Sequence, residues 1–236
     1  LEAKLSDPQT SLLILCNPQN PTGQCWSAED LDRIGKLCEQ YHVLVISDEI
    51  HCDLTDPDVS YIPFFSVSET NRRVGIACIA PTKTFSFPGL HTAAVYAADE
   101  AIRHKVRRQI NTDEVAEPGI FAIDAAIAAY TEGGEWLDAL RAYVLENKKL
   151  MRAFLREEFS GIYAIPSDAT YLLWIDARGA LPRLFGEGYA ERLADKKENP
   201  SDAVTALLRE RSGLVVNSGS VYRGNGADGF FRLNLA

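Results

Sequence analysis

An apolar run, a helical segment and a second apolar run follow one another near the start of the chain, and this order constrains the fold most. Residues 11–16 (SLLILC) and 43–47 (VLVIS) have the composition of strands that are buried on both faces of a sheet. Ser27 and Asp30 open the intervening segment in capping-box order, and its apolar residues recur at helical spacing. Strand, helix and strand in this order predict a parallel sheet with a right-handed crossover.

Further strands and helices follow, and the composition changes in the second half of the chain. We expect a long helix at residues 135–159 to connect two domains, because it is charged throughout and exceeds the usual helix length. The predicted fold class is therefore α/β, with a large domain at residues 1–140 and a smaller α+β domain at residues 141–236. The other predicted strands are 75–80, 93–98, 170–176, 214–219 and 230–236, and the other helices are 101–110, 118–130 and 203–211.

Charge and cysteine content exclude several classes of function. A formal net charge of -9 argues against nucleic acid or an anionic membrane as the partner, and no apolar run is long enough to span a bilayer. The five cysteines, at positions 16, 25, 38, 52 and 78, have no CxxC spacing. This pattern favours free thiols in a reducing, cytoplasmic setting over a disulfide framework.

The two ends of the sequence predict an internal piece of a longer protein. Met151 is the only methionine, so Leu1 is not a natural start. The chain stops at Ala236, directly after a strand-like run. We therefore expect part of the functional site, and the remaining strands of an incomplete sheet, to lie elsewhere in the protein.

Polar stretches follow three of the predicted strands. They are NPQNPTG (17–23), DEIHCD (48–53) and PTK (81–83). Because the carboxyl ends of parallel strands meet at one edge of a sheet, these stretches predict a ligand crevice. A lysine at a strand end usually extends its ammonium into water. In a crevice that also holds a carboxylate, Lys83 and Asp48 would instead suit pyridoxal 5'-phosphate, which needs an amine for a Schiff base and an acid beside its ring nitrogen.

Four motifs extend this interpretation to a family. CNPQNPTG, VISDEIH, APTKTFSFPG and FRLNLA occur in this order and span nearly the whole chain. Together they resemble the fold-type I superfamily of pyridoxal-phosphate-dependent aminotransferases, class I/II. The resemblance implies that Lys83 binds the cofactor as a Schiff base and moves the Cα proton, while Asp48 pairs with the pyridine nitrogen. It also implies that Asn20, often followed by a cis bond to Pro21, donates to the phenolic oxygen, and that Arg232 binds the substrate α-carboxylate.

Two departures from that pattern narrow the expected activity. His51 stands where the superfamily usually has tyrosine, and His91 stands where it usually has a phosphate-binding arginine. The strings SDEIHCDL and KTFSFPGLHT resemble the cystathionine β-lyase-like branch, in which the Thr82 hydroxyl would bind phosphate. The resemblance thus implies a homodimeric carbon–sulfur β-lyase that converts cystathionine or cysteine S-conjugates to thiol, pyruvate and ammonia. A class I/II aminotransferase and a non-catalytic regulatory relative are the open alternatives.

Two other interpretations of the same residues are disfavoured. The residues of DEIHCD could ligate a metal, or Cys52 and His51 could act as nucleophile and base of a hydrolase. Both require neighbouring side chains to converge, whereas a strand directs them to opposite faces. We therefore predict no metal. Ser218 and Tyr222 lie in the glycine-rich stretch 216–226 and are further candidates for a position near the substrate.

Overall fold

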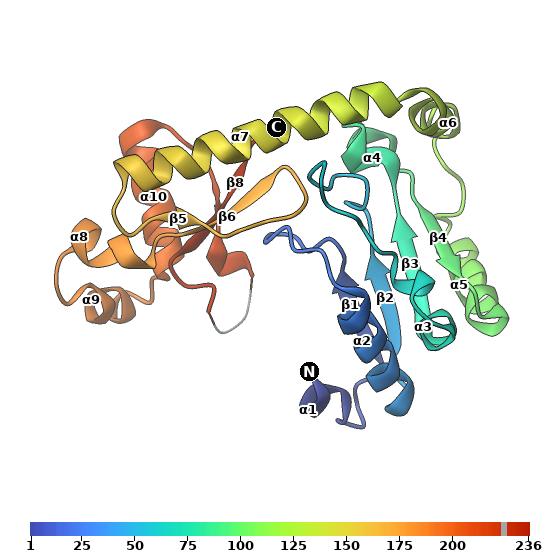
Figure 1. Ribbon diagram of the computed structural model, residues 1–236. Coiled ribbons are helices and arrows are strands. Elements are labelled where there is room, and N and C mark those ends of the chain that lie inside the picture. Colours follow the sequence, from blue (N-terminus) through green and yellow to red (C-terminus); the bar gives the residue numbers. More distant parts are fainter. Residues whose placement is uncertain (223–225) are drawn as a thin grey trace. The chain divides into compact units, whose positions relative to one another are not determined.

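The computed structural model describes residues 1–222 and 226–236, so residues 223–225 of the glycine-rich stretch lie outside the described part. Contacts divide the chain into two compact units, each with its own four-stranded sheet (Figure 1). Unit 1 comprises Leu1–Gln19, Gln24–Arg141 and Asp168–Thr170, and unit 2 comprises Asn20–Gly23, Ala142–Ser167 and Tyr171–Ala236. The predicted α/β class with a mostly parallel sheet in the first part is confirmed.

The sheet of unit 1 has the strand order β1-β2-β3-β4. The first three strands are parallel, and β4 runs antiparallel to β3. Its strands are β1 (Leu12–Cys16), β2 (Leu44–Asp48), β3 (Gly75–Ile79) and β4 (Ala94–Ala97). All four predicted strands therefore form, and each bound differs from the prediction by at most one residue.

Helix α2 (Ala28–Gln40) covers one face of this sheet. Its N-cap is Ser27, whose hydroxyl accepts a hydrogen bond from the backbone N–H of Asp30 at 3.1 Å. Side chains of the helix, including Leu31 and Cys38, pack in one core with Leu15, Val43 and Val45. The expectation that the first strand is buried on both faces is wrong, because Ile14 points away from α2 and is 66% exposed.

A buried asparagine joins α2 to the short helix α3 (Glu69–Val74). Asn71 is fully buried and donates to the carbonyls of Leu31 and Phe64 at 3.0 Å each. Gly35 of α2 lies directly against it: a Cβ added there would stand 2.1 Å from the Asn71 Oδ1. Only glycine permits this close approach.

The remaining helices of unit 1 lie before β1, between β3 and β4, and after β4 in the sequence. The division between the units falls within the long helix α7, after Arg141. Helices α1, α3 and α4 were not predicted, since segments of four to six residues are too short to show helical periodicity. The helices are α1 (Glu2–Leu5), α4 (Pro81–Thr84), α5 (Glu100–Thr112), α6 (Ala122–Glu132) and α7 (Gly134–Glu158), with the 3-10 turns η1 (Phe64–Ser66) and η2 (Pro88–Leu90).

Unit 2 has an antiparallel sheet with the order β5-β6-β8-β7. The side chains of Leu173, Ile175 and Phe231 pack with Leu155 of α7 and Val204 of α10 in its core. The predicted strand at 214–219 is reduced to β7, which pairs through two residues only. The elements are β5 (Tyr163–Ala164), β6 (Leu172–Asp176), η3 (Arg178–Ala180), α8 (Leu181–Phe185), α9 (Tyr189–Asp195), α10 (Pro200–Ser212), β7 (Asn217–Ser218), η4 (Gly219–Val221) and β8 (Phe230–Asn234).

Two further expectations concern the chain as a whole. Within residues 1–222 and 226–236, no helix is both long enough and apolar enough to cross a membrane. All five cysteines are free thiols; Cys38 is buried and the other four are partly buried.

Candidate active site

The three parallel strands of unit 1 end in one row. Asp48 is in register with Cys16 on one side and with Cys78 on the other. Pairing continues for one more residue, since the Asn17 N–H donates to the Asp48 carbonyl and the Glu49 N–H donates to the Cys78 carbonyl, both at 2.9 Å. The polar stretches that follow these strands therefore begin at one level of the sheet, as the sequence predicts.

Asp48 is a half-buried carboxylate at the centre of that row. Strand alternation places it on the sheet face of Leu44 and Ile46, opposite the face that α2 covers. Its Oδ1 accepts a long hydrogen bond from the Ile50 N–H at 3.3 Å, and it has no ion-pair partner among the described residues. A carboxylate in this setting is available to pair with a cation from outside the chain.

Lys83 lies on α4, a single helical turn that starts directly after β3. Pro81 occupies the first helical position, where its missing N–H costs no hydrogen bond. Thr84 anchors the turn from a fully buried position, donating to the Asp53 carboxylate at 3.2 Å. Thr82 and Lys83 are half-buried, and the Lys83 ammonium has no hydrogen bond or ion pair within the described part of the chain. Its fixed backbone and uncommitted amine suit a covalent or ionic role.

The residues after Asp48 leave the strand and form a turn. The prediction that strand alternation directs their side chains to opposite faces is therefore wrong. Glu49, 2% exposed, accepts from the Ser47 hydroxyl at 2.8 Å and from the Phe64 N–H at 3.0 Å, which identifies it as a structural carboxylate. His51 is also buried. No group of three or more His, Cys, Asp or Glu side chains that could hold a metal occurs in residues 1–222 and 226–236.

The Cys52 thiol is unsuited to nucleophilic catalysis. Burial, together with the negative charges of Asp53 and Glu49, raises its pKa to about 12. Because the thiolate is the reactive form, almost none is present at neutral pH. This finding weakens the hydrolase alternative on electrostatic grounds.

His91 lies on an exposed bend that follows η2. Its backbone is in the left-handed region, with φ 49°, and the residue lines a groove of ≈ 740 Å³ formed with α5. Arg103 and Arg107 line the same groove, but Arg103 already donates to the carbonyls of Ala97 and Ala98 at 2.9 Å. The assignment of His91 to phosphate stays a prediction.

The structure brings Asn20 and Arg232 together within unit 2. One Arg232 nitrogen, Nη1, donates to the Asn20 Oδ1 at 3.0 Å and to the Tyr222 hydroxyl oxygen at 2.6 Å, while Nη2 donates to the Asn217 Oδ1 at 3.0 Å. The expected cis bond between Asn20 and Pro21 is present, and the bond between Asn17 and Pro18 is also cis. Asn217 was missed because its pairing with Arg232 across β7 and β8 leaves no local sequence signal.

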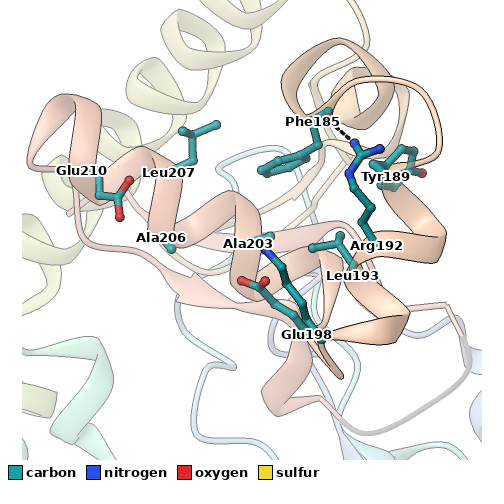
Figure 2. Close-up of a pocket in the computed structure, with 10 residues that line it drawn as sticks. Phe185, Tyr189, Arg192, Leu193, Glu198, Ala203, Ala206, Leu207 and Glu210 are labelled. Carbon is teal, nitrogen blue, oxygen red and sulfur yellow. Dashed lines mark hydrogen bonds between the residues drawn. The ribbon is translucent and has the colours of Figure 1, made fainter.

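A separate pocket of ≈ 280 Å³ lies between helices α8, α9 and α10 of unit 2 (Figure 2). Arg192 on its wall donates to the backbone carbonyl of Phe185, as Figure 2 shows, and also to that of Glu187, so two of its donors are already used within the chain. None of the predicted site residues lines this pocket. The predicted site residues that the structure groups together form two separate sets, the strand-end row of unit 1 and the Arg232 cluster of unit 2.

Comparison with known proteins places the chain in a family. The model of the family described as aminotransferase class I and II matches residues 1–236, which is the whole chain. The chain belongs to the aminotransferase class I and II family. Cystathionine beta-lyase PatB of Bacillus subtilis (strain 168) is 36% identical over 234 residues, covering 99% of this chain and 56% of that protein.

Solved structures of the family agree with this assignment. Cystalysin from Treponema denticola, which contains pyridoxal 5'-phosphate, matches with a TM-score of 0.86 and 25% identity, over 100% of this chain and 55% of that one. The pyridoxal-phosphate-bound C-S lyase from Staphylococcus hominis matches with a TM-score of 0.81 and 26% identity, over 99% and 56%. The chain spans about half the length of the relatives that it matches.

Proposed function

We propose that the protein is a pyridoxal-phosphate-dependent carbon–sulfur β-lyase that acts on cystathionine or related cysteine S-conjugates. The observation that carries this proposal is the strand-end row of unit 1, where Asp48 is central and Lys83 follows the adjacent strand, both without ion-pair partners in the described part. The similarity to cystathionine beta-lyase PatB and to the C-S lyase from Staphylococcus hominis supports the choice of lyase within the family.

The residues present fit pyridoxal phosphate. The Asp48 carboxylate, half-buried and not paired with a cation of the chain, matches a protonated ring nitrogen, because an opposite charge favours the protonated form. The Lys83 amine can react with the aldehyde group of the cofactor. Asn20 would hold the phenolic oxygen, and Thr82 would donate its hydroxyl to phosphate. We keep His51 and His91 as further candidates for cofactor contacts.

In the proposed reaction, these residues bind the amino-acid substrate and transfer its protons. Bound pyridoxal phosphate supplies the electron withdrawal that makes the Cα hydrogen acidic. Lys83 would take that proton, Asp48 would hold the proton on the ring nitrogen, and Arg232 would bind the α-carboxylate through its planar fork. The Cβ–sulfur bond then breaks, the sulfur leaves as a thiol, and one water completes the conversion of the three-carbon remainder to pyruvate and ammonia. The net reaction needs no oxidant.

The test is an assay of the holoenzyme with L-cystathionine. We expect release of pyruvate and thiol in equal amounts, and mass spectrometry after borohydride reduction should locate the cofactor on Lys83. Exchange of the amino group with a 2-oxo acid, without pyruvate release, would identify the aminotransferase alternative instead. Absence of both reactions in a protein that binds the cofactor would identify a non-catalytic relative.

We further propose that the whole protein is a cytoplasmic homodimer. The family resemblance implies the dimer, and exposed apolar side chains near and on α6 support it: Ile120 is 85% exposed, Phe121 70% and Ile127 57%. The free cysteines support a reducing compartment. Light scattering coupled to size exclusion should give twice the mass of one chain.

A further inference from the structure

Arg232 is oriented entirely by neutral oxygens among the described residues. Its acceptors are the amide oxygens of Asn20 and Asn217 and the hydroxyl oxygen of Tyr222, and no carboxylate forms an ion pair with it. Arg178, in contrast, meets the carboxylate of Asp176 in the same unit at 2.6 Å. The positive charge of Arg232 is thus held in place without being neutralised.

The hydrogen bonds leave a defined part of the guanidinium for a ligand. Of its five N–H donors, two belong to Nη1, and these serve Asn20 and Tyr222. One Nη2 donor serves Asn217. Among the described residues, the donor on Nε and the second donor on Nη2 have no acceptor, and two N–H groups on these nitrogens form a fork that matches the two oxygens of a carboxylate.

The ring of Tyr222 is itself held by aromatic packing. Trp174, 7% exposed, meets it edge to face with centroids 5.2 Å apart, and Phe230 stacks on Trp174 with centroids 5.3 Å apart. Trp174 is also the register partner of Arg232 across β6 and β8. Burial raises the pKa of Tyr222 above its ordinary value, although the charge and hydrogen bond of Arg232 act in the opposite direction. The phenol therefore stays neutral and retains its own O–H.

We propose that Tyr222 is a positioning residue, which fixes the Arg232 guanidinium so that its Nε and Nη2 donors face the substrate α-carboxylate. This inference rests on the proposed function, because it needs an amino-acid substrate that Arg232 binds. The Tyr222 hydroxyl accepts a hydrogen bond from Nη1 of Arg232. It therefore holds the guanidinium without occupying the donors that would face the substrate.

The decisive variant is Tyr222→Phe, which keeps the aromatic packing and removes the acceptor. In the holoenzyme we expect KM for L-cystathionine to rise about tenfold while kcat changes less than about twofold, since a lost hydrogen bond to a charged group weakens binding by roughly this factor. The Kd for glycine, followed by the visible absorbance of the cofactor, should rise by the same factor. Glycine has the carboxylate but no sulfur to release, so it reports binding alone.

The matched control is Tyr163→Phe. Tyr163 donates to Asp176 at 2.7 Å in the same sheet, so this change also deletes one hydrogen-bonded phenol from unit 2. We expect its KM and glycine Kd to equal those of the unmodified protein. If Tyr222→Phe does not fold, Tyr222→Leu replaces it: it removes the same acceptor of Nη1, and we expect the same rise of about tenfold in the glycine Kd.

The outcomes separate the two proposals. An active lyase in which Tyr222→Phe leaves both KM and the glycine Kd unchanged overturns the role of Tyr222 and leaves the lyase standing. A protein that binds pyridoxal phosphate and glycine but does not cleave cystathionine overturns the lyase, while the glycine Kd still decides the role of Tyr222. A protein that takes up no pyridoxal phosphate overturns both.

Discussion

The charged side chains predicted to bind a ligand are held differently in the two units. In unit 1, Asp48 and Lys83 are half-buried, and neither has an ion pair among the described residues. In unit 2, Asp176 and Arg178 bind each other, and Arg232 is held by three neutral oxygens. Because a partly buried charge without a partner loses hydration that nothing in the chain replaces, Asp48, Lys83 and Arg232 are the groups that we expect to meet a ligand.

The largest effect is expected for Lys83→Ala. Without the amine, kcat/KM for cystathionine should fall about 10⁴-fold, because the group that moves the Cα proton is lost. The measurement is pyruvate release by the holoenzyme. Lys36→Ala is the control, since Lys36 is a surface lysine paired with Asp32 at 2.6 Å and should leave the rate unchanged. Equal rates for the two variants would contradict any special role of the strand-end lysine.

Asp48→Asn should have the next largest effect. The amide keeps the shape but removes the negative charge, so kcat should fall several hundredfold, the usual cost of losing a preorganised electrostatic partner. Stopped assays over a range of enzyme concentrations can measure so low a rate. Asp58→Asn, on an exposed loop residue, serves as the control. A loss of less than about threefold would mean that Asp48 is not the partner of the ring nitrogen.

Arg232→Lys should have a smaller effect, seen mostly in KM. Lysine keeps the charge but lacks the planar fork and the donors to Asn20, Asn217 and Tyr222, so kcat/KM should fall about 30-fold. Steady-state kinetics with cystathionine measure this directly. An unchanged KM would show that the arginine has no part in carboxylate binding. The difference between the units would then no longer identify ligand-binding groups.

Asp176→Asn tests the Asp176–Arg178 ion pair, which is proposed to stabilise the fold only. The variant should therefore keep the lyase activity. Burial by itself would raise the pKa of Asp176, but hydrogen bonds from Arg178 and Tyr163 outweigh it and hold that pKa below its ordinary value. Its stabilising contribution is therefore present above the ordinary carboxyl range and is lost as the pH falls through the lowered pKa. Urea unfolding at pH 7 should show a loss of about 2 kcal/mol in the variant, shrinking at pH 2. A difference that grows in acid would contradict this.

Sequence patterns predicted the parts of the molecule that depend on local spacing. The strands of unit 1, the Ser27 cap and the level at which the strands end all follow from short-range patterns. The arrangement around Arg232 does not, because Asn217 meets it only through antiparallel register and Asn20 lies more than two hundred residues away in sequence. The exposed Ile14 was missed for a related reason: an apolar run does not show whether another segment covers its second face.

The register of Asp48 between Cys16 and Cys78 affects how the protein can be handled and labelled. Burial, and after it the negative charges of Asp48 and Glu49, raises the pKa of Cys78. An alkylating dye or peroxide reacts with the thiolate, so this sulfur should stay unmodified under conditions that label an ordinary exposed cysteine. A probe attached elsewhere can therefore report on the protein without adding bulk beside the central acid.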